Sequence, residues 1–121
     1  MIVDMKENQQ ATLKIALLAN PVPGQTANQP ANADGAPVWA LVQDPGGCTL
    51  TPAADGLSAL FVPGPIPAGT ESISAVVSAT ADAFFGDGVN PVVENFPITV
   101  HAIPVEFIQG SVELALRPQA A

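Results

Sequence analysis

The chain has 121 residues, a length that suits a single domain. Its residues are 48% apolar and only 12% charged, which excludes an intrinsically disordered chain, because such chains are poor in apolar residues and rich in charge. Three Lys and Arg against eleven Asp and Glu give a net charge of −8, which excludes a protein that binds nucleic acid through a basic face.

Cys48 is the only cysteine, so no disulfide can form within the chain. A free thiol fits a protein that folds in a reducing cytoplasm. The first residues contain acidic side chains and no apolar segment, unlike a secretory signal peptide. Pro, Gly or Ser interrupts every apolar run well short of the length of a membrane span. We therefore expect a soluble protein that has no membrane partner.

In the first half of the chain, apolar and polar residues alternate with a period of two, which is typical of half-buried strands. This pattern predicts strands over residues 11–18, 37–43, 48–51 and 57–62. Residues 20–36 contain three prolines and few apolar residues. We expect them to form a long loop of the kind that is either functional or mobile.

The second half of the chain continues the same period. Residues 63–69 hold three prolines and cannot form a regular strand, but residues 72–82 form the longest alternating segment, and residues 96–102 predict a further strand. The stretch between them, 82–90, is expected to be a loop. Since no segment repeats apolar residues at helical spacing, the chain predicts an all-β protein of about seven to eight short strands, packed as a sandwich.

The C-terminal residues, from about 103 on, lie beyond the strand that would close such a sandwich. Residues 105–116 alternate on both sides of Gln109-Gly110, which predicts a hairpin with a two-residue turn. One interpretation is an extra edge hairpin or a last core strand. In the other, the apolar face formed by Val112, Leu114 and Leu116 docks on a neighbouring subunit by strand addition, which would make the protein a homo-oligomer.

Five short motifs occur along the chain in this order: Val38-Trp39, Asp44-Pro45, Leu50-Thr51-Pro52, Asp55-Gly56 and Gly69-Thr70. Over about residues 9–102 the chain resembles the bacterial immunoglobulin-like domains of the group 2 type. The resemblance implies one immunoglobulin-like β-sandwich domain over 1–121, with its core at about 9–102 and a C-terminal extension at 103–121. The long Pro-rich loop and the extension depart from the family's pattern.

Trp39 is the expected centre of the core, because a Trp on a central strand fills the space between two sheets. Without a disulfide, it would share this role with apolar residues of three expected strands, namely Leu41, Ile73, Val77 and Ile98.

Residues for catalysis or for metal binding are few. His101 is the only histidine and falls on the polar side of its expected strand, and no cation lies near Cys48 in sequence to activate its thiol. Asp82, Asp87 and Asn90 offer oxygen ligands for calcium, but their spacing does not fit the twelve-residue calcium loop. We therefore expect no enzyme, no cofactor and no metal site.

Phe84 and Phe85 are the remaining candidates for partner contact. In a loop that contains glycines, both rings can be exposed, and aromatic residues are enriched at binding hot spots. The alternative is that they fill the inside of their own loop.

A small immunoglobulin-like protein without a secretion signal is similar to the accessory virion proteins of tailed bacteriophages, which fold in the host cytoplasm. This resemblance implies a non-enzymatic structural protein of the virion, which decorates or cements the capsid or tail and has the major capsid or tail protein as its partner. The alternative is a cell-surface or carbohydrate-binding module of the adhesin type that makes contact through loops 20–36 and 82–90. A fragment of a longer surface protein also fits.

Overall fold

The computed structural model describes residues 1–82 and 91–118, and within these ranges every regular element is a strand. The all-β prediction is confirmed. The strands are β1 (Val3–Lys6), β2 (Ala11–Lys14), β3 (Leu18–Ala19), β4 (Gln29–Pro30), β5 (Val38–Gln43), β6 (Thr49–Pro52), β7 (Ser58–Val62), β8 (Ser72–Asp82) and β9 (Pro91–His101).

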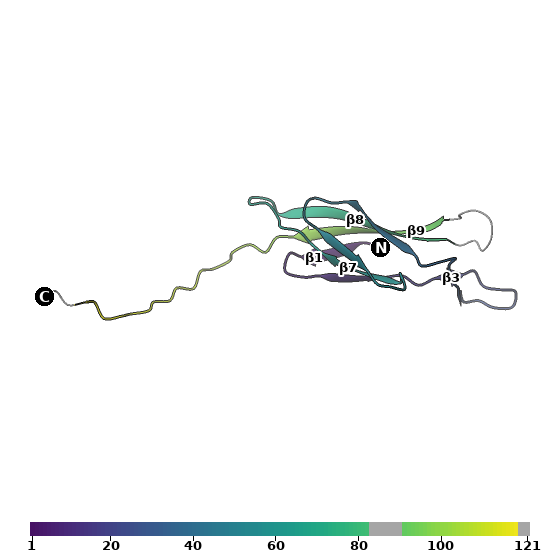
Figure 1. Ribbon diagram of the computed structural model, residues 1–121, viewed down its shortest axis with the longest axis horizontal. Helices are drawn as coiled ribbons and strands as arrows, with labels where there is room; N and C mark the ends of the chain where they lie inside the picture. Colours follow the sequence, from purple (N-terminus) through teal and green to yellow (C-terminus); the bar gives the residue numbers. More distant parts are fainter. Residues whose placement is uncertain (83–90, 119–121) are drawn as a thin grey trace.

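The strands form two larger sheets and a small one. The first sheet has the order β1-β9-β8-β5, the second has the order β2-β7-β6, and β3 pairs with β4 alone. Strands β8 and β9 are antiparallel along eleven residue pairs, whereas β1 runs parallel to the end of β9. The two larger sheets lie as layers along the long axis of the domain, as Figure 1 shows.

The core lies between these layers and draws on the inner face of each. On β8, Ala75, Val77 and Ala79 are buried in alternation with more exposed residues. Phe61 of β7 and Met5 of β1 belong to the same buried cluster, together with Leu13, Trp39, Cys48, Ala59, Phe96, Ile98 and Val100. Each fully buried large apolar side chain stabilises the fold by about 1.5–3 kcal/mol, so this shared cluster holds the sheets together.

Trp39 is buried in this core, as the sequence predicts. Its indole Nε1–H donates a hydrogen bond of 2.7 Å to the backbone oxygen of Gly56, so the polar atom of the ring is satisfied within the apolar layer. Of the residues expected around it, Val77 and Ile98 are in the core, and Leu41 and Ile73 pack against it while partly buried.

Two turns approach each other closely at one end of β6. The backbone N–H of Gly64 donates to Sγ of Cys48 at 3.3 Å, and the Asp44 carboxylate accepts from the N–H groups of Gly46 and Cys48. A Cβ atom added at Gly64 would lie 2.0 Å from the oxygen of Gly46. Any larger residue at position 64 would therefore clash with the backbone of the other turn.

Several strand boundaries differ from those predicted. The pattern gives no strand before residue 9, but β1 pairs with β9 and contributes Met5 to the core. The strand expected over 11–18 is divided into β2 and β3, and the loop expected over 20–36 contains β4. Strand β9 begins at Pro91, five residues before its predicted start, since β1 pairs with β9 only from Ile98 onward and leaves the earlier prolines on an open edge.

The hairpin predicted for residues 105–116 is wrong. No strand is present from 102 to 118, and this segment leaves the end of β9 as an extended tail that projects away from the domain (Figure 1). A two-stranded hairpin is only marginally stable in water by itself. At the end of β9 from which this segment leaves, β9 already lies between β1 and β8, so the predicted arms have no open edge of β9 beside them.

Candidate interaction surface

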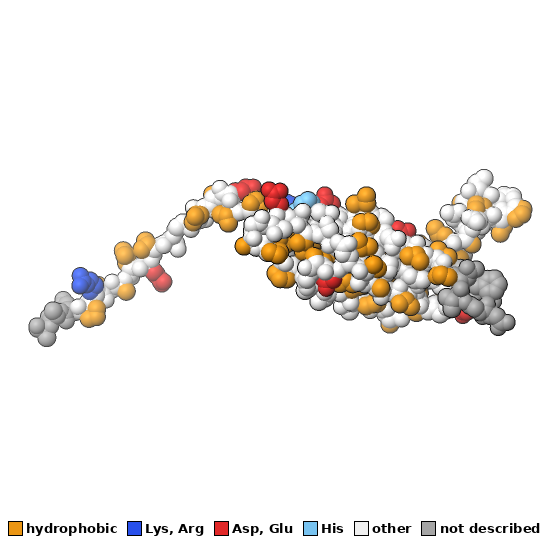
Figure 2. Space-filling view, turned by 90° about the horizontal axis from the view of Figure 1, so that it is seen from above, with side chains coloured by type: hydrophobic (Ala, Val, Ile, Leu, Met, Phe, Trp, Pro, Cys, Tyr) orange, Lys and Arg blue, Asp and Glu red, His pale blue; other side chains and the backbone are white. Residues whose placement is uncertain are grey.

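The tail, defined as residues 104–118, carries the predicted contact residues. Val112, Leu114 and Leu116 are 81%, 90% and 99% exposed, and Phe107 and Ile108 are exposed to a similar degree. Figure 2 shows apolar side chains along the whole length of the projecting tail. The tail thus presents two apolar groups of residues to water, 105–108 and 112–116, separated by Gln109-Gly110-Ser111 and each containing one Glu. Exposed apolar side chains gathered in this way are typical of a contact surface.

The domain holds this segment only at its root. The backbone N–H of Ala102 donates to the oxygen of Glu71 at 2.8 Å, and that of Ile103 donates to Oε1 of Glu7 at 3.0 Å. Beyond Ile103, no hydrogen bond, ion pair or ring contact joins the tail to the rest of the described chain. The tail is therefore free to bind elsewhere.

A second surface lies at the opposite end of the domain. It is an open groove with a volume of about 510 Å³, which we call the β8–β9 groove. One wall is the end of β8 and the start of β9, and the other comes from the chain around β3 and β4. Its lining residues are Ile15–Asn20, Ala31–Ala33, Ala79, Ala81, Asp82 and Val92–Glu94.

The groove exists because the core is not closed at this end. Val92 and Glu94 are in register with Ala81 and Ala79 of β8, so they share the inner face of the sheet with Phe96, two residues further on. Phe96 is buried, but Val92 is 60% exposed. The inner face of β9 is therefore open beyond Phe96, whereas Ala79 and Ala81, beside it on β8, are buried.

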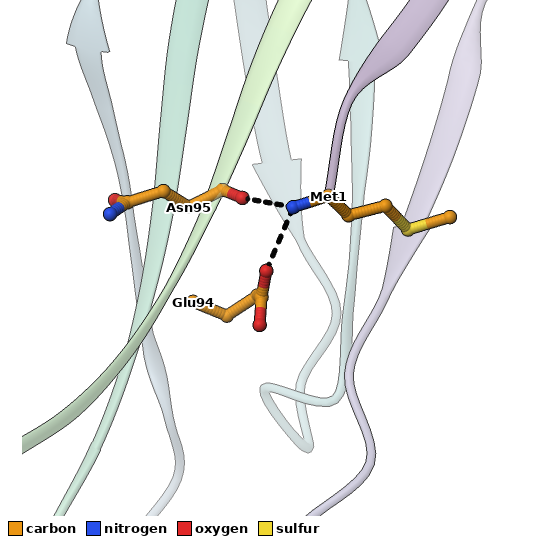
Figure 3. A network of polar contacts seen from close by, with 3 residues as sticks. All are labelled: Met1, Glu94 and Asn95. Carbon is orange, nitrogen blue, oxygen red and sulfur yellow. Dashed lines mark hydrogen bonds and ion pairs between the residues drawn. The ribbon is translucent and has the colours of Figure 1, made fainter.

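The edge of β9 is also open along this groove. Strand β1 pairs with β9 only at Ile98 and beyond, and the chain continues back to Met1 at the level of Asn95 (Figure 3). There the amino group of Met1 donates to the backbone oxygen of Asn95 at 2.8 Å and to Oε1 of Glu94 at 3.0 Å. In the described part of the chain, no strand lies beside Pro91–Glu94 on the side opposite β8.

Backbone hydrogen bonds fix the other wall of the groove. The N–H of Ala31 donates to the oxygen of Leu17, and the N–H of Asp34 donates to the oxygen of Asp82, both at 2.8 Å. The second bond ties the chain after β4 to the end of β8. The groove is therefore a built feature of the fold, not a gap beside a loosely attached loop.

The remaining candidates are placed as follows. Phe84 and Phe85 lie outside the described residues. His101 is at the end of β9, half exposed, with its Nε2 in contact with Oδ1 of Asp4 on the adjacent strand β1. Cys48 is buried, and this burial raises the pKa of its thiol. A buried thiol with a raised pKa is a poor nucleophile.

The suggested calcium ligands are only partly visible. Asp87 and Asn90 lie outside the described residues, whereas Asp82 is the last residue of β8, and its backbone oxygen accepts a hydrogen bond from the N–H of Asp34. Among residues 1–82 and 91–118, no three His, Cys, Asp or Glu side chains lie together so that they could hold a metal ion. In the same ranges there is no helix that could cross a membrane.

The groove was not predicted, because its walls come from segments that are far apart in the sequence. A signal for one wall is nevertheless present. Every second residue of β9 points inward, and this period runs from Val100, Ile98 and Phe96 back to Glu94 and Val92. On the neighbouring strand β8, the residues paired with Glu94 and Val92 are Ala79 and Ala81. The polar residue Glu94 at an inward position indicates an end of the β9 face that the core does not fill.

Comparison of the chain with models of protein families, with curated proteins and with solved structures found no match.

Proposed function

We propose that the two layers form an immunoglobulin-like β-sandwich. If β2 and β5–β9 are lettered B to G in chain order, one sheet has the order B-E-D and the other has C, F and G side by side. The immunoglobulin fold divides its strands in the same way. The division of strands between the sheets supports this proposal better than the short motifs of the sequence do.

The position of Trp39 gives further support. It lies on β5, the strand lettered C, where immunoglobulin domains carry a buried Trp. The disulfide between strands B and F is absent, because Cys48 is the only cysteine, and a tyrosine corner is excluded because the chain has no Tyr. Leu13 of β2 and Val77 and Ala79 of β8 belong to one buried apolar cluster, so apolar packing joins the two sheets without a disulfide.

The function that we propose is that of a non-enzymatic structural protein of a bacteriophage virion, which decorates or cements the capsid or tail. The observation that carries this proposal is the tail, a segment with exposed Val112, Leu114 and Leu116 that extends from a folded domain. A tail of this kind can hold a domain on a larger assembly without any chemical reaction. The net charge of −8 favours a partner patch that is rich in Lys or Arg.

Mass spectrometry of virions tests this function directly. Particles are purified from a lysate of the cell that carries this gene, and the ratio of this chain to the major capsid protein is measured. We expect a fixed ratio that survives repeated gradient purification. Absence of the chain from particles of full infectivity would contradict the proposal.

The salt dependence of release from the particles tests the electrostatic part. An increase in NaCl from about 0.1 M to about 1 M shortens the Debye length from about 10 Å to about 3 Å, so an interaction between an acidic domain and a basic patch weakens. Release that does not depend on salt would assign the attachment to apolar contacts of the tail. If the chain is absent from virions but gives signals on a glycan array, the adhesin-type function replaces the structural one.

A further inference from the structure

The end of the tail has the pattern of a strand that lacks a partner. Val112, Leu114 and Leu116 are spaced by two residues, so in an extended chain all three side chains lie on one face. Their exposed fractions exceed 80%. An apolar strand of this kind, with its backbone unpaired, is a template for pairing with another chain.

The β8–β9 groove offers what such a strand lacks. Within the part of the chain that the structure describes, the backbone of Val92–Glu94 pairs with β8 on one side only, so its other side can accept a further strand. Beside this open edge lies the groove, which Ala79, Ala81 and Val92 line; the two alanines are buried at its floor, whereas Val92 is 60% exposed. A strand added here gains backbone hydrogen bonds and places alternate side chains over an apolar surface.

We propose that the tail of one copy adds as a strand to the open edge of β9 in a second copy, so that Val112, Leu114 and Leu116 close the β8–β9 groove. The proposal concerns association between copies of this chain and does not depend on whether the chain is part of a virion.

The positions of the two surfaces favour a second copy over the same molecule. The chain leaves β9 toward the tail after His101, at one end of the strand, and the groove is at the other end, about 30 Å away at 3.3 Å per residue (Figure 1). To reach its own groove, the tail would have to reverse direction and pass β1, which occupies the edge of β9 next to the root of the tail. A second copy can meet the same tail in its extended form.

Charge supports the same pairing. Arg117 directly follows Leu116 and is the only basic residue of the tail, whereas the acidic residues Asp82 and Glu94 line the groove, where Glu94 also pairs with the amino group of Met1. A docked tail brings Arg117 close to them. The copies as a whole each carry −8 and repel one another over longer distances, an effect that salt screens.

The geometry also defines the type of assembly. Each copy has one tail and one groove at opposite ends, so the contact is heterologous. Association can continue from copy to copy and either closes into a ring or extends as a chain.

A complementation experiment tests this proposal. One variant ends after Ile103 and keeps its groove, and the other carries Val92→Lys and keeps its tail. We expect the full chain to form oligomers larger than dimers in sedimentation velocity between about 1 μM and 1 mM, each variant to be monomeric, and the equal mixture to give only a 1:1 complex. Val42→Lys, a matched change at an exposed residue of β5 that does not line the groove, should associate like the unchanged chain.

Substitutions in the tail complete the test without affecting the domain, since no hydrogen bond or ion pair joins the tail to residues 1–82 or 91–101. Leu114→Asp should weaken association by at least about tenfold, because a carboxylate cannot enter an apolar groove without cost, whereas Leu114→Ile should retain it. Circular dichroism checks that both variants keep the β fold. A full chain that stays monomeric over the whole range would overturn the proposal. Oligomers that persist at the same level in Val92→Lys would do so as well.

A disulfide between introduced cysteines tests the contact between the tail and the groove directly. Val92→Cys and Leu114→Cys chains are mixed and oxidised, with Cys48 buried in both. We expect a mixed disulfide dimer, which should not form when Val42→Cys replaces Val92→Cys, because disulfides need Cβ atoms about 4 Å apart. A crosslink that forms equally well with both would show random collision and contradict the proposed site.

Salt separates this proposal from the virion function. Apolar docking between two acidic copies should strengthen as NaCl increases, since screening reduces their repulsion, whereas attachment to a basic capsid patch should weaken. Self-association that weakens with salt would show that the attraction of Arg117 to the acidic groove residues dominates. It would therefore overturn the apolar docking proposed here and leave the result from the virions unaffected.

Discussion

The indole of Trp39 stacks on the ring of Phe96, with ring centroids 5.6 Å apart and ring planes inclined by 25°, although their strands β5 and β9 are separated by β8. Trp39 is in register with Ala79 of β8, and Phe96 with Val77. Because the side chain of Ala79 is only a methyl group, the two rings can meet above β8. The aromatic centre of the core therefore depends on a small residue between two large ones.

Enlarging Ala79 should disrupt this stack. We expect Ala79→Leu to lower the free energy of unfolding by about 1–3 kcal/mol, because added methylenes in a packed core force the neighbouring side chains from their rotamers. Urea unfolding followed by circular dichroism measures the change. Ser74→Leu makes a comparable enlargement at an exposed position of the same strand and should change the free energy by no more than about 0.5 kcal/mol. Equal effects of the two variants would contradict this account.

The hydrogen bond from the indole to Gly56 gives a second prediction. Trp39→Phe keeps an aromatic ring but removes the Nε1–H donor, so the backbone oxygen of Gly56 loses its partner. We expect a loss of about 1–3 kcal/mol in the free energy of unfolding. Trp39→Ala should cost more, about 3–5 kcal/mol, because it also leaves a cavity. Trp39 is the only Trp, so circular dichroism must replace fluorescence. A Phe variant as stable as the original would show that the bond contributes nothing.

The elements that could be predicted from the sequence are those whose burial follows a simple period. Strand β8 has the predicted bounds, Ser72 to Asp82, because its inner residues alternate without a break. Strand β1 could not be found in this way, since four residues are too few to show a period and its partner β9 lies about ninety residues away. The beginning of β9 could not be predicted because Pro91 and Pro97 are unfavourable in a strand unless the edge of that strand is open. Whether an edge is open depends on the arrangement of the whole sheet, which the local sequence does not contain.

The candidate interaction surface could also be predicted from the sequence only in part. The apolar face of Val112, Leu114 and Leu116 was recognised from its spacing, but the hairpin that was to carry it was wrong. A turn signal at Gln109-Gly110 does not create a strand where no neighbour is present to pair with it. The groove depends on how Ile15–Asn20 lies against Val92–Glu94, a tertiary relationship that no local pattern contains.

The close approach at Gly64 predicts a sensitive position outside the core. In Gly64→Ala the new Cβ would lie 2.0 Å from the oxygen of Gly46 and 2.7 Å from the carbonyl carbon of Gly47. Both are backbone atoms and cannot rotate away, so we expect a loss of at least about 3 kcal/mol. Gly110→Ala in the tail meets no atom within 4 Å and should leave the thermal midpoint unchanged. A stable Gly64→Ala variant would contradict the described packing of these turns.

Burial of Cys48 predicts a pH dependence in the alkaline range. Desolvation, the larger cause, and the nearby Asp44 raise the pKa of this thiol above 9.0, its ordinary value. As the pH rises, the thiol therefore loses its proton at a lower pH in the unfolded chain than in the folded one. The contribution of Cys48 to stability is complete below the ordinary pKa and is lost as the pH rises through the raised pKa of the folded state. We expect the original chain to be more stable than Cys48→Ala at pH 7, and the difference to shrink above about pH 9. A difference that grows with pH would mean that the pKa is lowered instead. At pH 8 the folded thiol should also react with a disulfide reagent far more slowly than in urea.

Asp44 predicts the opposite dependence in acid. The N–H of Gly46 is the main cause that lowers the pKa of the Asp44 carboxyl below 3.8, its ordinary value, and the Cys48 N–H adds to it. For a group whose pKa is lowered on folding, the contribution to stability is present above the ordinary pKa and is lost as the pH falls through the lowered one. Asp44→Ala should therefore unfold at a lower urea concentration than the original chain at pH 6, and the two midpoints should converge as the pH falls below about 3.8. Glu106→Ala removes the same charge from the tail, where it makes no contact with the domain, and thus measures the effect of net charge alone. If the gap between the original chain and Asp44→Ala stayed constant down to the lowest pH at which the protein folds, the carboxylate would not be the acceptor that holds this turn.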